Sequence, residues 1–273
     1  MADKAVIVTG ACGGIGSSLT HAFKDAGYFV VGTDLKEKSP QVYSDVFLQI
    51  DLQKIWVDSN YSEQIFSKLF ELVGDMKLNC FINNAAVQFV LPIEEVTRAQ
   101  VSEIFAVNVF APFLFAQAFI EKLSESNGTI INIGSVHSTQ TKPNFSIYAM
   151  TKSALDGITR SLAVECGSRV RVVGIAPGAI STTMLEDGFK NDKTARNELN
   201  KMQPMGRIGM PPEVADLAYD KGTNYSAPYA WGTTGICYRS DLVDFTPDSW
   251  NDLLNPKDSV KGKTTMLSTE RWL

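Results

Sequence analysis

Histidine and cysteine are scarce in this chain. Two histidines and four cysteines occur among 273 residues, and the cysteines stand far apart, at positions 12, 80, 166 and 237. Zinc sites and disulfide frameworks use cysteines or histidines at short, regular spacings, and no such spacing is present. The sequence therefore predicts neither a metal site nor a disulfide framework, and we expect free thiols.

A surplus of basic residues is also absent. Lysine and arginine total 25 against 30 acidic residues, whereas nucleic-acid binders usually carry a basic surplus. No cationic start followed by an apolar run precedes Val6, so no signal peptide is predicted. The most apolar stretch, 104–120, is interrupted by Asn108, Pro112 and Gln117, and it reads as too short and too polar for a membrane span. We expect a cytoplasmic protein that binds neither nucleic acid nor membrane.

Strand and helix patterns alternate over the first 218 residues. Short apolar runs rich in β-branched residues predict strands at Ala5–Thr9, Phe29–Gly32, Val46–Ile50, Cys80–Ile82, Thr129–Ile133 and Val170–Ile175. Helices are expected up to about Ala26 and over 61–74, 98–124 and 148–166. Near-continuous apolar strands separated by helices indicate an α/β fold, with a Rossmann-like, doubly wound parallel sheet covered on both faces.

A glycine-rich turn, Thr9–Gly16, follows the first predicted strand and opens a helix. Glycines there permit a tight turn and let backbone N–H groups approach a pyrophosphate at the helix N-terminus. The spacing is GxxxGxG rather than GxGxxG, so its interpretation depends on context. A glycine-rich turn without a ligand is the alternative.

Polar residues follow the next strands. Asp34 stands 18 residues after Gly16, where an acid can bond the ribose 2′-OH of the cofactor's adenosine. A carboxylate repels a 2′-phosphate, and the glycine turn holds no basic residue, so the pattern favours NAD over NADP. A solvated loop acid is the alternative. Asp51 suits either an adenine contact or a helix cap. The amides of Asn83 and Asn84 can fix a ligand or neighbouring strands.

Tyr148 and Lys152 stand four residues apart, so on a helix they share one face. A phenol beside an ammonium is a proton donor, because a nearby positive charge lowers the pKa of tyrosine from about 10. The pair follows Ser135 after a short loop. Together with the glycine turn, this predicts a nucleotide cofactor site and an acid/base site in one fold.

These motifs, in this order, resemble the short-chain dehydrogenase/reductase family over about residues 3–218. The resemblance also rests on Asn108 and on the run Pro177–Thr182, while Ala86 stands where the family usually has glycine. It implies an NAD-dependent oxidoreductase that interconverts a secondary alcohol and a ketone. Cytoplasmic homo-oligomers are implied, through the helices at 98–124 and 148–166.

The resemblance also implies a role for each site residue. Tyr148 would be the general acid/base. Lys152 would lower the pKa of Tyr148 and bond the nicotinamide ribose. Ser135 would hold the substrate oxygen. Asn108 would break its helix locally and order a water. The implied cofactor-binding residues are Gly10, Gly14, Ile15, Gly16, Asp34, Asp51, Leu52, Asn83, Ala85, Tyr148, Lys152, Pro177, Gly178, Ile180 and Thr182.

Two features keep alternative interpretations. His137, two residues after Ser135, is either a substrate contact or a plain loop histidine. An apolar stripe on the helix at 98–124 covers either a second subunit or the sheet of its own chain. The stripe consists of Phe105, Val109, Phe113, Ala116 and Ile120.

The composition changes near Leu217–Asp220. Three of the four tryptophans, at 231, 250 and 272, fall in the last 55 residues, and the strand–helix rhythm stops. Residues 219–273 resemble an interior piece of a polyamine-type periplasmic solute-binding protein. We therefore expect a composite: a dehydrogenase domain at 1–218 and a foreign tail at 219–273, not an independent domain. The family's seventh strand would be missing or replaced.

The tail leaves other interpretations open. A divergent family tail would use Gly235–Tyr238 as the lost strand. In the composite, segment 229–238 is expected to pair with the free edge of the sixth strand, and the three tail tryptophans are expected to be exposed. The alternative functions are a composite or truncated chain that binds cofactor without turnover, and a polyamine-binding module. The intact Asn108, Ser135, Tyr148 and Lys152 favour an active dehydrogenase.

Overall fold

The computed structural model describes residues 3–187, 193–203, 205–218, 226–227 and 236–237. By its internal contacts the chain divides into two units, Met1–Tyr219 and Asp220–Leu273. This division lies one residue from the boundary drawn from composition. Each unit is described by itself.

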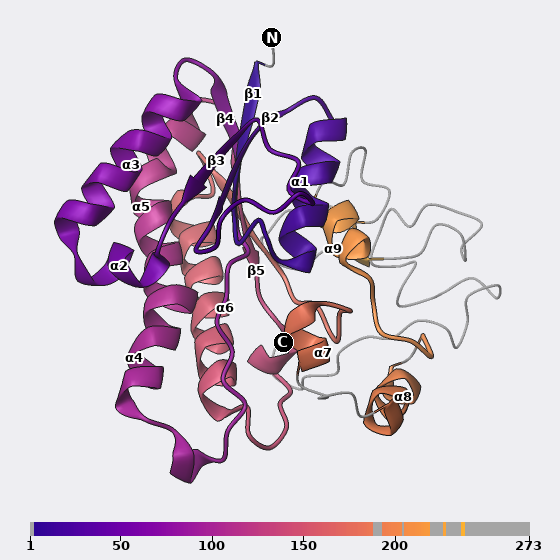
Figure 1. The fold of residues 1–273 in the computed structure, drawn as a ribbon. Helices are drawn as coiled ribbons and strands as arrows, with labels where there is room; N and C mark the ends of the chain where they lie inside the picture. The colour runs from indigo at the N-terminus through magenta and orange to yellow at the C-terminus, as the bar shows by residue number, and fades with distance from the viewer. Residues whose placement is uncertain (1–2, 188–192, 204, 219–225, 228–235, 238–273) are drawn as a thin grey trace. The chain divides into compact units, whose positions relative to one another are not determined.

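A six-stranded parallel sheet forms the centre of the first unit, with the strand order β3-β2-β1-β4-β5-β6 (Figure 1). The chain runs outward from β1 to β3, then returns to add β4 on the other side of β1, where Ile7 pairs with Val31 and with Phe81. This reversal is the topological switch point, where open α/β sheets bind ligands. The strands are β1 Lys4–Thr9, β2 Phe29–Asp34, β3 Val46–Gln49, β4 Lys77–Asn83, β5 Thr129–Ile133 and β6 Arg171–Ile175.

Helices cover both faces of this sheet, as Figure 1 shows. One face carries α1 (Gly14–Asp25) and α9 (Pro211–Ala218), and the other carries α3 (Ser59–Val73), α5 (Ala111–Ser124) and α6 (Ser146–Cys166). The remaining helical elements are α2 Leu52–Val57, η1 Ile93–Glu95, α4 Arg98–Phe105, η2 Ala106–Phe110, η3 Val136–Ser138, α7 Thr183–Asp187 and α8 Lys193–Met202. The predicted doubly wound fold is confirmed.

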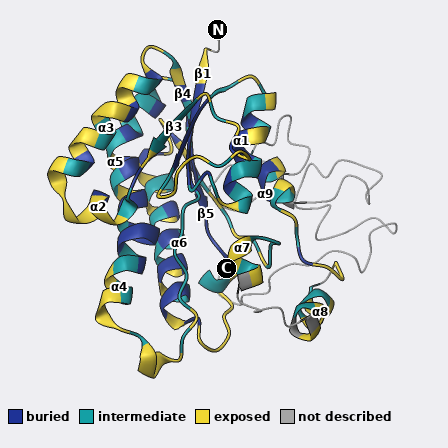
Figure 2. Cartoon of the chain, viewed as in Figure 1, coloured by how far each residue is buried: buried dark blue, intermediate teal, exposed yellow. Residues whose placement is uncertain are grey.

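The two layers of the core follow from the two-residue period of the strands. Along β1, Val6 and Val8 face α1 and α9, while Ile7 faces the aromatic cluster under α5. In that cluster the rings of Phe81 and Phe115 lie 5.0 Å apart. Figure 2 shows the buried residues along the sheet and the inner faces of its helices. A strand buried on both faces explains why its sequence is a continuous apolar run.

The helical stretch Arg98–Ser124 corrects the expectation that the segment 104–120 is too short and too polar to span a membrane. It spans 27 residues, and its most apolar part has a mean hydropathy of 1.7, so its length and composition would allow it to cross a membrane. Its most apolar part is 56% buried inside the protein, and Phe115, Phe119 and Leu123 belong to the core. Its apolar character is therefore that of a core helix. The predicted local break is present as a π-helical turn, η2.

Among the described residues, β6 is the edge strand of the six-stranded sheet on the side opposite β3. Within the second unit, β8 (Ile236–Cys237) pairs antiparallel with β7 (Ser226–Ala227). Of segment 229–238, predicted to pair with β6, only Ile236 and Cys237 are described, and its pairing with β6 stays a prediction. The tail tryptophans lie outside the described residues.

Candidate active site

The glycine turn is shaped by a lack of space for side chains. Gly10 has a φ of +66°, and a Cβ there would stand 2.7 Å from the Cα of Ala85. A Cβ on Gly16 would stand 2.0 Å from the carbonyl oxygen of Gly10. A Cβ on Gly14 would stand 3.1 Å from a methyl group of Thr182. The fold thus brings together five predicted cofactor residues from three separate segments.

The N-terminus of α1 opens beside this turn. Helix α1 begins at Gly14, with Ile15 in its first turn, and its N-cap residue Gly13 makes no side-chain capping bond. Backbone N–H groups at such a helix start favour an anionic group. A glycine cradle that no side chain can enter, ending at a helix N-terminus, fits the pyrophosphate of a dinucleotide.

Asp34 ends β2 directly beside the glycine turn. Its Oδ2 accepts a hydrogen bond of 2.9 Å from the backbone N–H of Cys12, and its Oδ1 accepts one of 3.0 Å from that of Lys36. The carboxylate is therefore held in place and remains partly exposed. Its role as a ribose ligand stays a prediction.

Asp51 is the N-cap of α2, which begins at Leu52. Its Oδ1 accepts hydrogen bonds from the backbone N–H groups of Gln53 and Lys54 at 3.0 and 3.4 Å. The capping role weighed for this residue is thus realised. An adenine contact through the same carboxylate stays a prediction.

The asparagines after β4 connect neighbouring strands. Asn83 donates a 2.8 Å hydrogen bond to Oδ1 of Asn132 on β5. Asn84 donates to the carbonyl oxygens of Thr9 and Gly10 at 2.9 and 3.0 Å. These amides hold the switch point in register, and they place Ala85 against the glycine turn.

Ser135, Tyr148 and Lys152 gather in one buried site at the C-terminal end of β5. Their exposed fractions are 6%, 8% and 3%. The Lys152 Nζ donates a 2.7 Å hydrogen bond to the carbonyl oxygen of Ile133 and lies 5.6 Å from the centroid of the Tyr148 ring. The Ser135 hydroxyl lies close enough to Tyr148 to affect the pKa of its phenol. A serine, a phenol and an ammonium thus meet where the sequence predicted an acid/base site.

The protonation of this pair differs from the prediction. Burial raises the pKa of Tyr148 to about 12, and the nearby Ser135 hydroxyl opposes that rise. Burial also lowers the pKa of Lys152 to about 8, and the charge of Asp156 opposes that fall. The predicted lowering of the Tyr148 pKa by Lys152 is wrong for this structure, because desolvation of the phenol dominates.

Asn108 connects the segment after β4 to α6. It is buried in η2, where its Oδ1 accepts from the backbone N–H of Val87 at 2.8 Å. Its Nδ2 donates to the Val87 carbonyl at 2.9 Å and to the Thr151 hydroxyl at 3.1 Å. The residue therefore positions the helix that carries Tyr148. Its ordering of a water stays a prediction.

The loop after β6 connects the catalytic and cofactor sides. The carbonyl oxygen of Pro177 accepts from the backbone N–H of Val136 at 3.1 Å, next to Ser135. Further along, Ile180 forms a parallel bridge with Gly209, and Thr182 lies against Gly14. Gly178 lies between these contacts.

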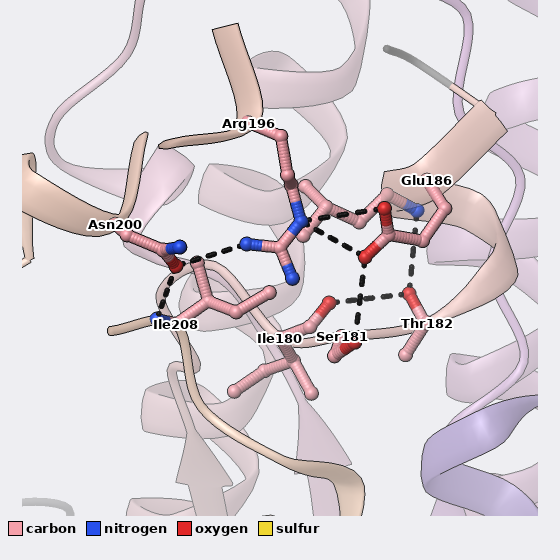
Figure 3. Close-up of polar contacts among 8 residues, drawn as sticks. Ile180, Ser181, Thr182, Glu186, Arg196, Asn200 and Ile208 are labelled. Carbon is pink, nitrogen blue, oxygen red and sulfur yellow. Dashed lines mark hydrogen bonds and ion pairs between the residues drawn. The ribbon is translucent and has the colours of Figure 1, made fainter. Parts of the chain in front are cut away.

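Sequence reasoning missed the polar network that holds this loop (Figure 3). Arg196 on α8 donates to Oε1 of Glu186 on α7 at 3.0 Å and to Oδ1 of Asn200 at 2.9 Å. The same Asn200 oxygen accepts from the backbone N–H of Ile208 at 3.1 Å. Glu186 and Ile208 stand 22 positions apart in the sequence, so no local sequence pattern predicts the whole network.

His137 is packed beside Tyr148. Its ring stacks on Phe145 at 4.5 Å and meets the edge of Tyr148 at 5.9 Å, while its Nδ1 pairs with the Thr141 hydroxyl at 3.0 Å. Burial and then the charge of Lys142 lower its pKa, which favours the neutral ring. It is an anchored loop histidine at the border of the site. A substrate contact stays a prediction.

Known proteins are similar to this chain in sequence. Residues 10–219 match the family model described as enoyl-(acyl carrier protein) reductase. L-fucose dehydrogenase of Oryctolagus cuniculus is 32% identical over 232 residues, covering 80% of this chain and 78% of the relative. The chain belongs to the short-chain dehydrogenase/reductase family. It is accordingly an oxidoreductase of the NAD(P)-dependent kind.

Solved structures of family members share the fold. Aldohexose dehydrogenase of Thermoplasma acidophilum is 25% identical with a TM-score of 0.72, covering 80% of this chain and 86% of that protein. An enzyme of Beutenbergia cavernae, described as a putative NAD(P)-dependent gluconate 5-dehydrogenase with bound NADP, is 27% identical with a TM-score of 0.71. That match covers 80% of this chain and 88% of that protein.

A second family model matches the C-terminal part of the chain. It is described as bacterial extracellular solute-binding protein and matches residues 174–273. The predicted resemblance of the tail to a solute-binding protein is confirmed. The match begins earlier than residue 219 and overlaps the dehydrogenase match over 174–219.

Proposed function

We propose that this protein transfers a hydride between NAD(H) and a secondary alcohol or ketone. The observation that carries the proposal is the buried cluster of Ser135, Tyr148 and Lys152 at the C-terminal end of β5. A pure binding module needs no buried proton donor beside an ammonium. The cofactor, when bound, supplies or accepts the hydride, and the protein orients it and handles the proton.

Each member of the cluster has a distinct part in the reaction. Tyr148 exchanges a proton with the substrate oxygen, and its raised pKa keeps it protonated before ketone reduction. Ser135 donates to the same oxygen as negative charge develops there. Lys152 stabilises the tyrosinate that remains after proton transfer and bonds the nicotinamide ribose.

The glycine turn and the N-terminus of α1 would hold the pyrophosphate. Asp34 would bond the adenosine ribose 2′-OH and repel the 2′-phosphate of NADP, which supports NAD as the preferred cofactor. Asp51 and Leu52 would border the adenine. Pro177, Gly178, Ile180 and Thr182 would line the nicotinamide side.

Polyhydroxylated substrates are the first to test. The relatives named above act on fucose, on an aldohexose and on gluconate by their descriptions. We therefore propose an activity screen of sugars and sugar acids, then steroids, hydroxy acids and small alcohols, with NAD and with NADP. Turnover supports the proposal. Binding of NADH without turnover on any substrate supports a cofactor-binding chain. If the chain shows no turnover and no NADH binding, the result supports a chain with no intact site.

We also propose a cytoplasmic homo-oligomer formed through α5 and α6. Within the stripe on α4 and α5, Val109 and Ala116 are buried in the chain itself, whereas Phe113 is 43% exposed. On α6, Met150 and Val164 are 50% and 89% exposed. Exposed apolar side chains on these two helices fit a second copy of the chain better than water.

The composite character of the chain belongs to this proposal as well. The overlap of two family models and the division near residue 219 support a dehydrogenase joined to a solute-binding fragment. Calorimetry with spermidine tests the alternative of a polyamine-binding module. Micromolar binding would make the tail a functional part, and its absence would support an inactive fragment.

A further inference from the structure

A carboxylate lies on the same helix as the buried ammonium of Lys152 and points to the same end of β5. Asp156 follows Lys152 by four residues on α6, so both side chains leave the same face of the helix. The Lys152 Nζ donates to the carbonyl oxygen of Ile133 at 2.7 Å. Oδ1 of Asp156 lies 3.2 Å from the point where a Cβ on Gly134 would stand. The ammonium and the carboxylate therefore lie at neighbouring residues, Ile133 and Gly134, of one strand end.

The glycine at position 134 leaves room for this approach. A Cβ there would press on Oδ1 of Asp156 and on the carbonyl oxygen of Ile175, each 3.2 Å away. The backbone N–H of Gly134 donates to that same Ile175 oxygen at 2.7 Å, so the strand end cannot shift aside. The carboxylate therefore lies at Gly134, one residue after the carbonyl group that accepts from the ammonium.

Few other charges face Lys152 from the elements packed against α6. On η3 the nearest ionisable group is His137, which is favoured as neutral. Helix α4 carries Arg98 and Glu103 at exposed and partly exposed positions, and η2 carries no ionisable residue. Arg171 on β6 bonds Thr129 at the opposite end of β5. In the described part of the chain, Asp156 is the charge that acts on the Lys152 ammonium.

We propose that Asp156 is a positioning residue that keeps Lys152 protonated in the working enzyme. An ammonium removed from water loses hydration free energy, and an adjacent anion restores part of that loss. The consequence for catalysis rests on the proposed function, because only a charged Lys152 stabilises the tyrosinate of Tyr148. Asp156 would touch neither substrate nor cofactor.

The direct test measures the protonation of Lys152 without any substrate. The full-length chain is labelled with ¹³C-lysine, and the Cε resonance of Lys152 is identified by its loss in Lys152→Arg. We expect Asp156→Asn to move the titration midpoint of this resonance to lower pH, and Asp156→Glu to restore it. Glu165→Gln, which removes a charge from an exposed position on the same helix, is the matched control and should leave the midpoint unchanged.

The catalytic test follows the pH dependence of ketone reduction. Asp156→Asn and the wild type should be equally active near pH 6, where Lys152 is charged in both. At pH 7.5–8 the variant should be about three- to tenfold slower, since more of its Lys152 is neutral. An unchanged Lys152 midpoint in Asp156→Asn would overturn the inference. A wild-type chain with no turnover on any alcohol or ketone would instead refute the proposed function, while the resonance still decides the role of Asp156.

Discussion

On the β1–β3 side of the sheet the site is made of backbone, whereas on the β4–β6 side it is made of buried side chains. Gly10 and Gly16 act by leaving space, and the N-terminus of α1 offers N–H groups. Tyr148 and Lys152 bring ionisable groups, and burial raises the pKa of Tyr148 to about 12 and lowers the pKa of Lys152 to about 8. The first side therefore depends on steric fit, and the second on desolvated charge.

The largest expected effect breaks the side-chain half alone. Tyr148→Phe removes the proton donor and keeps the ring, so turnover should fall by about 10²–10⁴-fold. The NADH dissociation constant, measured by fluorescence, should change by no more than about threefold, because the backbone half is untouched. Retained turnover would mean that another group donates the proton.

The next effect breaks the backbone half alone. Gly16→Ala places a Cβ 2.0 Å from the Gly10 carbonyl oxygen, so the turn must open. Overpacking of this kind costs about 1–3 kcal/mol, and NADH affinity should fall by up to roughly 100-fold. Gly157→Ala is the matched control, since a Cβ there meets nothing within 4 Å. Equal NADH affinity in the two variants would contradict a cradle at Gly16.

A smaller effect tests whether a side chain tunes the backbone half. Asp34→Ala removes the carboxylate beside the cofactor's expected 2′ position, so the preference for NADH over NADPH should narrow by about tenfold. Titration of the wild type and the variant with both cofactors measures it. Tighter binding of NADPH than NADH by the wild type would overturn the assignment of NAD.

The smallest effect concerns stability and sharpens the contrast in charge. Lys152 has a folded pKa near 8 against an ordinary 10.5, so between these values the unfolded chain binds more protons. The buried Lys152 ammonium therefore lowers the free energy of unfolding below pH 8. This destabilisation is lost as the pH rises from about 8 to 10.5. Lys152→Met should stabilise the protein by about 1 kcal/mol at pH 7, with less gain near pH 10. Urea unfolding at both pH values checks this, and an equal difference at both would contradict it.

A separate prediction concerns the proposed second copy. Val164→Glu places a charge on the most exposed apolar position of α6 and should shift the protein toward the monomer. Light scattering coupled to size-exclusion chromatography measures the mass of the wild type and of the variant. A monomeric wild type would refute association through this helix.

The sequence alone determined the order of the six strands and of the longer helices between them, and it predicted the candidate site residues. Apolar runs such as Thr129–Ile133 are recognisable because a doubly covered strand has no polar face. The glycine turn and the spacing of Tyr148 and Lys152 are local patterns, so they could be found without coordinates. The change in character near residue 218 could be found in the same way.

The tertiary structure alone decided what these residues experience. The network around Arg196 and the contacts of Asn108 join segments that are far apart in the chain. The capping role of Asp51 depends on the local direction of the backbone. The pKa values of Tyr148 and Lys152 reversed the simplest expectation, because burial is a property of the whole fold and outweighs one neighbouring charge. The spacing of Tyr148 and Lys152 predicts that they share one face of a helix. Only the packing of the whole fold decides how much water remains around them.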